Sequence, residues 1–199
     1  MNRLADLLVA GAALVLTAPL LAVCAVAIKL DSRGPVLYRQ RRVGRDGAPF
    51  ELYKLRTMVV GAESTGAGLY IEARDARITR VGWVLRRFSL DELPNLLNVL
   101  RGELAVVGPR PTVQEQVDRY TAHQRRRLEV KPGITGWAQV NGRTSLSWPE
   151  RIELDVWYVD NRSPALDLRI LARTARMLLS GDGLYSSDLE QGWGEKPPE

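Results

Sequence analysis

Two adjacent carboxylates, Asp91 and Glu92, follow closely after two arginines, Arg86 and Arg87. A carboxylate near cations stays ionised, and the same cations attract a phosphate group. An ionised Asp beside Mg²⁺ could attack phosphorus, while the neighbouring Glu could bind the metal or accept a proton. This segment therefore predicts chemistry on a phosphate-bearing substrate with a divalent metal.

The same residues also fit a purely structural interpretation. Ser89-x-x-Glu92 matches the capping box that opens many helices, and acids in a first helical turn complement the helix dipole. In this interpretation the two acids would only stabilise a helix from about residue 90 to 100. The cations on both sides, including Arg101 and Arg110, favour the catalytic interpretation.

A second candidate feature is the turn Gly108-Pro109-Arg110-Pro111. The two prolines restrict the backbone on both sides of Arg110. A rigid turn alone would explain them, but such a turn could also present a preset guanidinium fork to a phosphate.

The segment Lys131–Arg143 has the pattern of a turn, a short strand and a second turn. Some of its side chains could bind a base or a pyrophosphate, or could simply complete an edge of the core. These side chains are Trp137, Gln139, Asn141 and Arg143.

The composition excludes several other kinds of site. The chain has 199 residues and a net charge of +5, with one cysteine, Cys24, and one histidine, His123. A disulfide within the chain is impossible, and a zinc site of Cys and His ligands is close to excluded. The sequence also has neither a phosphate-binding P-loop nor the glycine spacing of a dinucleotide site.

The uncharged run Leu7–Ile28 is 22 residues long, enough to cross a hydrocarbon core of about 30 Å. Three interpretations compete: a signal peptide, a spanning helix and a re-entrant helix. The basic residues that follow the run oppose export. Pro19 removes a helical hydrogen bond near its middle, and a bent helix would let both basic flanks face the same anionic leaflet. We therefore favour the re-entrant helix.

The remaining sequence predicts a compact, mostly helical α/β domain that lies on the membrane. In its last expected helix, Arg169, Arg173 and Arg176 form a stripe that could reach lipid headgroups or simply form a solvated face. We expect strands at 36–38 and 50–56, and helices at 78–87, 90–100, about 112–127, from 147 and from 163.

Taken together, these motifs resemble the bacterial sugar transferases, specifically the small monotopic phosphoglycosyl transferases that act on polyprenyl phosphate. The resemblance extends from about Arg3 to about Ser180. The segments that carry it, in family order and spacing, are Leu90–Pro94, Val107–Pro111, Lys131–Arg143, Leu154–Tyr158 and Leu166–Asp167.

The resemblance implies a re-entrant membrane helix, Mg²⁺ as cofactor, and an Asp-Glu dyad that matches Asp91 and Glu92 as catalytic and metal-binding residues. The Asp would attack a UDP-sugar and release UMP, and polyprenyl (undecaprenyl) phosphate would then take the phosphosugar from the enzyme. The expected substrate-binding residues are Lys54, Arg56, Arg86, Arg110, Gln139, Arg143 and Asp167.

One position departs from the family pattern. The family commonly has Ser before the membrane proline, whereas this chain has Ala18 before Pro19. Because Ala cannot bond a freed backbone carbonyl, the helix break would depend on Thr17 or on Pro19 alone.

The resulting expectations cover domains, location and partners. Residues 1–30 form the re-entrant helix, 31–185 the catalytic domain and 186–199 a flexible tail. The protein is expected at the cytoplasmic face of the bacterial inner membrane, with a UDP-sugar, polyprenyl phosphate and phospholipid as partners and no nucleic acid. The residues leave open which sugar is used and whether a homo-oligomer forms. One rival function is that of a UDP-releasing glycosyltransferase, but such enzymes usually carry an Asp-x-Asp motif, which this sequence lacks. The other is that of a non-enzymatic basic protein that binds nucleic acid or anionic lipid.

Overall fold

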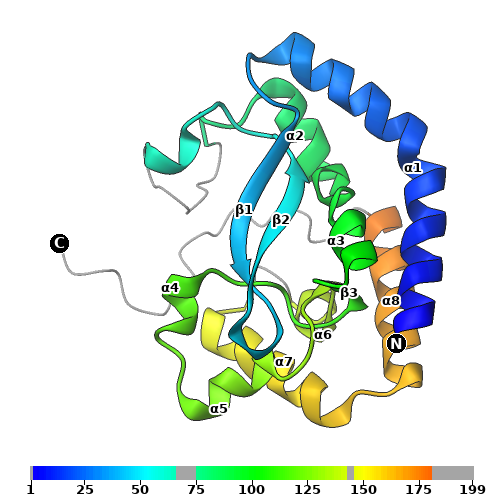
Figure 1. Cartoon of the computed structure of the whole chain (residues 1–199), viewed down its shortest axis with the longest axis vertical. Helices are drawn as coiled ribbons and strands as arrows, with labels where there is room; N and C mark the ends of the chain where they lie inside the picture. The colour runs from blue at the N-terminus through cyan, green and yellow to red at the C-terminus, as the bar shows by residue number, and fades with distance from the viewer. Residues whose placement is uncertain (1, 66–74, 143–145, 181–199) are drawn as a thin grey trace.

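A long apolar helix, α1 (Arg3–Asp31), lies along one side of the molecule in the computed structural model (Figure 1). The structure describes residues 2–65, 75–142 and 146–180, so the expected tail at 186–199 lies outside the described residues. The Asn2 side chain accepts a hydrogen bond from Ala5 N at 2.9 Å and caps the start of α1. The inner side of α1 includes buried Ala10, Cys24 and Ile28, whereas its outer side is apolar and exposed.

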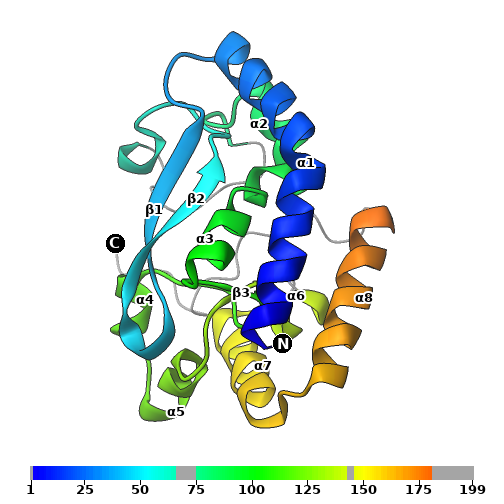
Figure 2. The same ribbon diagram turned by 45° about the vertical axis from the view of Figure 1, so that its right-hand side comes forward.

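Pro19 does not interrupt α1, which is assigned as one helix of 29 residues. Figures 1 and 2 show instead that its axis changes direction part-way along. Thr17 Oγ1 donates to Ala13 O at 2.7 Å, so this hydroxyl bonds the carbonyl four residues earlier and not Val15 O, the carbonyl that Pro19 leaves without its usual partner. The expected break at Ala18–Pro19 is therefore a bend within a continuous helix.

Both ends of α1 are fastened to the rest of the chain. Near its start, Arg3 donates to Val99 O at 2.5 Å, and Asp6 Oδ1 accepts from Val106 N at 3.1 Å. At its other end, Asp31 Oδ2 accepts from Val81 N at 3.0 Å. The two ends of the apolar helix thus contact the same folded domain.

A β-hairpin follows α1. Strands β1 (Leu37–Val43) and β2 (Pro49–Leu55) pair antiparallel from Leu37–Leu55 to Val43–Pro49, around the short helix η1 (Arg45–Gly47). The strands expected at 36–38 and 50–56 are confirmed, and the first is longer than expected. Because side chains alternate along a strand, the register places Arg42 and Lys54 on the same face of the hairpin.

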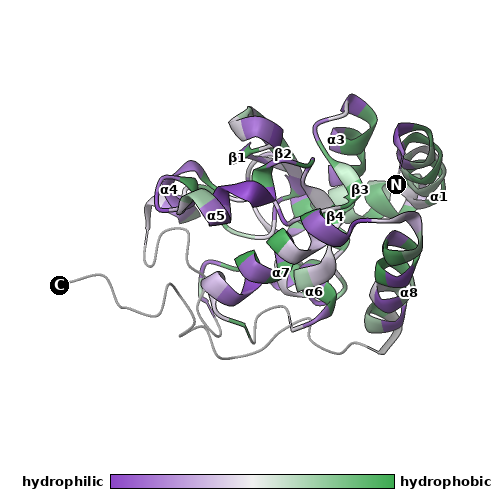
Figure 3. Cartoon of the chain, turned by 90° about the horizontal axis from the view of Figure 1, so that it is seen from below, coloured by the Kyte–Doolittle hydropathy of each residue, from purple (hydrophilic) through white to green (hydrophobic). Residues whose placement is uncertain are grey.

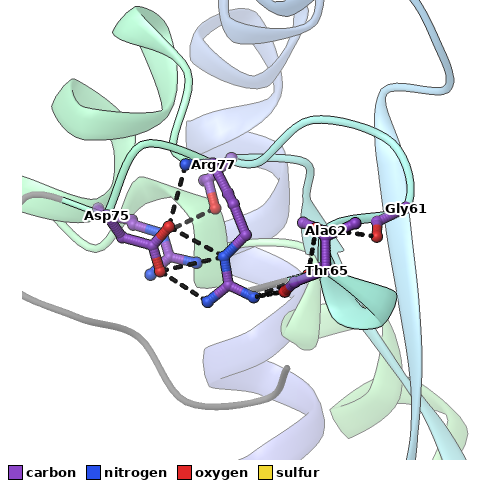
Figure 4. Close-up of polar contacts among 7 residues, drawn as sticks. Gly61, Ala62, Thr65, Asp75 and Arg77 are labelled. Atoms are coloured by element: carbon purple, nitrogen blue, oxygen red, sulfur yellow. Dashed lines mark hydrogen bonds and ion pairs between the residues drawn. The ribbon is translucent and has the colours of Figure 1, made fainter. Parts of the chain in front are cut away.

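Residues on either side of segment 66–74 are joined by Arg77. Its guanidinium forms an ion pair with Asp75 at 2.6 Å and donates to the carbonyls of Ala62 at 2.7 Å and Thr65 at 2.8 Å (Figure 4). Ala62 belongs to the short helix η2 (Ala62–Ser64). These contacts hold the residues that precede the segment next to the residues that follow it.

The Asp-Glu motif lies in a short turn between two short helices. Helix α2 (Arg80–Arg87) is followed by the 3₁₀ turn η3 (Leu90–Glu92) and then by α3 (Asn95–Arg101). The expected helix at 78–87 is confirmed. The helix expected at 90–100 begins only at Asn95, because Asp91 and Glu92 belong to the separate 3₁₀ turn.

A second, parallel pair of strands joins β3 (Ala105–Val107) to β4 (Gly133–Thr135). The helix expected at about 112–127 is instead three short helices, since a capping box at Thr121 starts a new one. These are α4 (Gln114–Val117), α5 (Ala122–Arg125) and η4 (Arg126–Leu128).

The chain then enters α6 (Trp137–Val140), α7 (Trp148–Asn161) and α8 (Pro164–Ser180). The capping box at Ser147 is confirmed, and Ser163 Oγ accepts from Leu166 N at 3.2 Å at the start of α8. The largest apolar cluster joins elements from α1 to α8, and α8 lies beside α1 in all three ribbon views (Figure 3). The buried members of this apolar cluster are Ala10, Phe50, Leu52, Leu96, Val99, Leu104, Val106, Val107, Tyr158 and Ile170.

The expected arginine stripe of α8 divides between two environments. Arg173 donates to Asn141 Oδ1 at 2.6 Å and lies over the Trp137 ring, so it packs against α6. Arg169 and Arg176 are exposed. The described fold is a mostly helical α/β domain with one long apolar helix at its side.

Candidate active site

The turn that carries the acids has an unusual backbone. Ser89 adopts the left-handed conformation, with φ 54° and ψ 24°, and its side chain caps no helix. A left-handed non-glycine residue costs free energy and persists only where surrounding contacts hold it. The capping-box interpretation of Ser89 and Glu92 is therefore wrong, and the Glu92 side chain is available for other partners.

Glu92 binds two cations through a single oxygen. Lys54 Nζ and Arg110 Nη2 each lie 2.7 Å from Glu92 Oε1. Burial alone would raise the pKa of Glu92, but the charges and hydrogen bonds of Arg110 and Lys54 hold that pKa well below its usual range. Glu92 is thus a firmly ionised carboxylate that holds together three segments distant in sequence.

Asp91, next in the same turn, has a different environment. Its side chain is nearly buried, with 9% of the residue exposed, and within the described residues its carboxylate has no hydrogen bond or ion pair. Burial raises the pKa of Asp91, Lys54 opposes this increase, and the Glu92 charge adds to it. The two adjacent acids therefore have pKa values shifted in opposite directions, as expected for two carboxylates with different roles.

Arg110 is presented by two chain segments that cross at close range. Gly108 N donates to Thr135 O at 2.9 Å, and Gly133 N donates to Pro109 O at 2.8 Å. A Cβ atom on Gly133 would lie 2.1 Å from Gly108 N, and one on Gly136 would lie 2.2 Å from Gly108 O. Glycine at these positions lets the two motifs form a single structural unit.

Two further arginines hold the backbone of this turn. Arg127 Nη2 donates to Arg110 O at 3.0 Å, and Arg42 Nη1 donates to Pro111 O at 3.3 Å. Arg127 is itself buried and forms an ion pair with Asp155 at 2.5 Å. The direction of the Arg110 side chain is thus set by a supported backbone.

Arg86 completes the basic surroundings of Asp91. Its Nε donates to Thr57 Oγ1 at 2.8 Å, and its charge lowers the pKa of Asp91. A Cβ atom on Gly82 would lie 2.0 Å from Thr57 O, so glycine allows α2 to approach this strand end closely. Three cations, Lys54, Arg86 and Arg110, therefore act on the same carboxylate.

Comparison with known proteins identifies the family of this chain. The family model described as bacterial sugar transferase matches residues 1–181. The chain belongs to that family.

Three relatives illustrate its range. An "Uncharacterized sugar transferase EpsL" of Bacillus subtilis is 46% identical over 188 residues, covering 94% of this chain and 92% of the relative. A "UDP-glucose:undecaprenyl-phosphate glucose-1-phosphate transferase" of Caulobacter vibrioides is 43% identical, covering 92% and 72%. A "UDP-N-acetylgalactosamine-undecaprenyl-phosphate N-acetylgalactosaminephosphotransferase" of Aeromonas hydrophila is 42% identical, covering 89% of this chain but only 43% of that longer protein.

Within this sugar transferase, three of the expected substrate-binding residues have other contacts. Arg56 is buried and donates to Pro35 O at 2.6 Å and to Ser32 Oγ at 2.7 Å, so its guanidinium fastens the end of α1. Gln139 Nε2 donates to Ile134 O at 3.0 Å. Asp167 is buried in α8 and accepts from Tyr158 OH at 2.7 Å. The described contacts do not bring these three to Asp91, and Arg143 lies outside the described residues.

Sequence reasoning missed several residues around the site. Arg42 and Asn95 line a small pocket together with Lys54, Glu92 and Arg110. Arg42 lies beyond the strand expected at 36–38, and only the longer β1 of the structure places it on the face of Lys54. The contact of Arg127 with Arg110 O had no signal in the sequence, since its partner is a backbone carbonyl.

The acidic turn also bears on the expected Mg²⁺. No group of three or more His, Cys, Asp and Glu side chains among the described residues could hold a metal ion. Two adjacent carboxylates nevertheless suit Mg²⁺, which is commonly bound by one or two carboxylates with waters and substrate phosphates. Within the described residues Glu92 Oε2 has no bonded partner, so it could take part. The donor set fits an ion held jointly with a substrate and not a preformed cage.

Proposed function

We propose that this protein transfers a sugar 1-phosphate from a UDP-sugar to undecaprenyl phosphate and thereby starts the synthesis of a polysaccharide. The observation that carries the proposal is the turn in which Asp91 is buried and unpaired within the described residues, beside Glu92 held by Lys54 and Arg110. Family membership and the reactions named for the Caulobacter and Aeromonas relatives support it.

In the first step, a carboxylate oxygen of Asp91 forms a bond to the sugar-proximal phosphorus. The bond from that phosphorus to the bridging oxygen breaks, and UMP leaves with the electron pair. Asp91 suits this role because it has no bonded partner among the described residues, and nearby Lys54, Arg86 and Arg110 favour its ionised form. The product of the step is a phosphosugar covalently attached to Asp91.

In the second step, a phosphate oxygen of the polyprenyl phosphate attacks the same phosphorus. The bond to Asp91 breaks, which regenerates the carboxylate and yields a polyprenyl-diphosphate sugar. Arg110 and Lys54 stabilise the charge that accumulates on the phosphoryl oxygens in both steps. Mg²⁺ held by Asp91 and Glu92 together with the donor would neutralise phosphate charge and screen its repulsion of the nucleophile.

We propose further that α1 enters the cytoplasmic leaflet of the bacterial inner membrane as a bent re-entrant helix. Its outer face is apolar and exposed, as at Leu16 (79%) and Leu30 (83%), and such a continuous apolar surface is expected to be covered. Arg3 and Asp31, at opposite ends, both bond to the same domain. A spanning helix would separate its two ends by the bilayer, so this arrangement supports the monotopic alternative, with the domain on one face.

The first experiment measures nucleotide release from a panel of UDP-sugars by the detergent-purified protein. It is run with and without polyprenyl phosphate and Mg²⁺, beside Asp91→Asn. We expect repeated turnover to UMP only when lipid, metal and intact Asp91 are all present, because without lipid the first step can release at most one UMP per protein molecule. Release of UDP would instead indicate ordinary glycosyl transfer, and release of UMP by Asp91→Asn at the wild-type rate would remove Asp91 from the mechanism.

A further inference from the structure

The pocket beside Glu92 has more positive than negative charge. Three cations line it, Arg42, Lys54 and Arg110, whereas Glu92 is the one carboxylate among its described lining residues. Both Lys54 and Arg110 use Glu92 Oε1, so a single negative charge serves two of the three cations. The third cation is therefore not balanced by an acid in the pocket.

Arg42 is that third cation, and its bonded partners are neutral. Its Nε donates to Gln40 Oε1 at 2.9 Å, and its Nη1 donates to Pro111 O at 3.3 Å. Within the described residues Arg42 forms no ion pair with a carboxylate. Burial, followed by repulsion from Arg110, lowers the pKa of Arg42 to about 10, which still leaves it charged at neutral pH. An anion entering the pocket would relieve this repulsion.

A second observation in the same pocket also indicates a ligand. Asn95 is 4% exposed, and its buried Oδ1 has no hydrogen-bond partner among the described residues. Buried polar groups are nearly always bonded, so this unbonded oxygen in a residue that lines the pocket is an acceptor that a hydroxyl or N–H group of a bound molecule would satisfy. The side chain follows Glu92 by three residues, at the start of α3.

We propose that Arg42 binds the diphosphate of the nucleotide-sugar donor together with Lys54 and Arg110, and that Asn95 Oδ1 accepts a hydrogen bond from a hydroxyl group of the same donor. The assignment rests on the proposed function. The Arg42 fork is oriented by Gln40, whose Nε2 donates in turn to Glu63 Oε1 at 2.9 Å. Such a preset fork suits phosphate oxygens. The donor would thus be held by β1, β2 and the Gly-Pro-Arg-Pro turn at once.

The test is calorimetric binding of UDP and of the responding UDP-sugar, with Mg²⁺, to Asp91→Asn protein that cannot turn the donor over. Into this background we introduce Arg42→Gln, and separately Arg41→Gln as the matched control. Arg41 is exposed on the opposite face of the same strand. We expect Arg42→Gln to weaken binding at least about tenfold, as for loss of a charge-assisted hydrogen bond, and to make binding less sensitive to ionic strength. Arg41→Gln should bind like its parent.

Three outcomes would overturn the assignment of Arg42. Equal donor affinity with and without Arg42→Gln would do so while leaving the proposed function intact. Weaker binding with an unchanged salt dependence would mean that Arg42 only holds the turn through Pro111 O. If neither the Asp91→Asn protein nor the wild-type protein binds any UDP-sugar in the presence of Mg²⁺, the proposed function fails, and the assignment fails with it.

A conservative variant covers the case in which Arg42→Gln does not fold. Arg42→Lys keeps the charge but loses the fork, so its affinity for the donor should fall several-fold while its salt dependence persists. Parental affinity in Arg42→Lys, together with an unfolded Arg42→Gln, would indicate a purely structural role and would also overturn the proposal.

Discussion

Two clusters of cations and carboxylates in this molecule contain similar residues but differ in how their charges are paired. Arg127 and Asp155 form a buried pair in which one cation meets one anion, with a further hydrogen bond from Arg127 to Tyr120 OH. In the turn η3, one oxygen of Glu92 receives two cations, while neighbouring Asp91 has no bonded partner among the described residues. Each charge of the first group is paired with one opposite charge, whereas the charges of the second group are not paired one to one.

This difference separates a group that supports the fold from one prepared for a ligand. In a matched buried pair each charge is already neutralised by its partner. A cluster that has cations without their own anion and an acid without a bonded partner can instead bind the negative charge of a phosphate-bearing substrate. The strained backbone of Ser89 lies at the second group, where such strain is typically found. The two groups meet at Arg110, whose backbone oxygen Arg127 binds.

The largest expected effect comes from breaking the balanced pair. Asp155→Asn leaves the buried Arg127 charge without its anion, so we expect the free energy of unfolding to fall by about 3–5 kcal/mol. Denaturant unfolding measures this change. The control is Asp160→Asn on the same helix, which removes an exposed pair with Arg126 and should cost less than about 1 kcal/mol. Equal losses in the two variants would contradict the comparison.

The next effect is expected at the unbalanced group. Arg110→Gln removes a cation that would contact phosphate, and we expect kcat/KM for the donor to fall roughly 10- to 100-fold, or about 1.4–2.7 kcal/mol. Because Arg110 also helps to hold the pKa of Glu92 low, the free energy of unfolding should fall as well, and the assay is run at a temperature where the variant is folded. Steady-state UMP release checks this, with exposed Arg119→Gln as the control outside the pocket. An unchanged kcat/KM would exclude Arg110 from donor binding.

A smaller effect distinguishes the two acids by stability. The pKa of Asp91 is raised by burial, so its ionised form costs folding free energy at neutral pH, and this cost disappears as pH falls through the raised pKa. Asp91→Asn should therefore unfold at a higher temperature, with a gain of about 2–4 °C per kcal/mol. Thermal unfolding at pH 7 provides the measurement.

Glu92→Gln is the counterpart and should have the opposite sign. The depressed pKa of Glu92 means that its carboxylate stabilises the fold above its unfolded pKa of about 4.3, and this stability is lost as pH falls through the folded value. Glu92→Gln should therefore unfold at a lower temperature than wild type at pH 7. Two variants with shifts of the same sign would show that the acids do not differ in this way.

The smallest effect concerns pH and activity. Attack requires ionised Asp91, so the acid limb of the kcat/KM profile should lie above the ordinary Asp value of about 3.9. Arg86 lowers the pKa of Asp91, so Arg86→Gln should move this acid limb to higher pH. A limb that stays in place would argue that another group titrates. The pH profile of donor binding serves as the control.

Much of the site could be predicted because its components are adjacent in sequence or have a simple period. The association of Asp91 and Glu92 with cations followed from the charges near them, and Lys54 and Arg110 do meet Glu92. What could not be predicted is which basic residues are used by the fold. Arg56 resembles Lys54 in sequence context, yet its donors bond Pro35 O and Ser32, and such bonds leave no pattern in the sequence.

The fold shows the same limit. The presence of the apolar helix and of the hairpin followed from composition and alternation, although the helix has 29 residues and extends beyond the run of 22 uncharged residues. The turn η3 did not, because the left-handed Ser89 contradicts the local preference that made Ser89-x-x-Glu92 look like a helix start. Tertiary contacts of Glu92 with two distant segments outweigh that preference. Local rules failed where the chain carries its candidate chemistry, as expected for strained functional sites.

The crossing of Gly108 with Gly133 and Gly136 has a consequence for exchanging parts between relatives. Because a methyl group at either later glycine would overlap the backbone of the first, the turn that bears Arg110 and the strand that follows Lys131 keep one shared geometry. A chimaera intended to alter donor preference should transplant both segments as one cassette. If only one of the two segments were exchanged, the new backbone would have to fit against the other segment at a contact that leaves no space for a change in geometry.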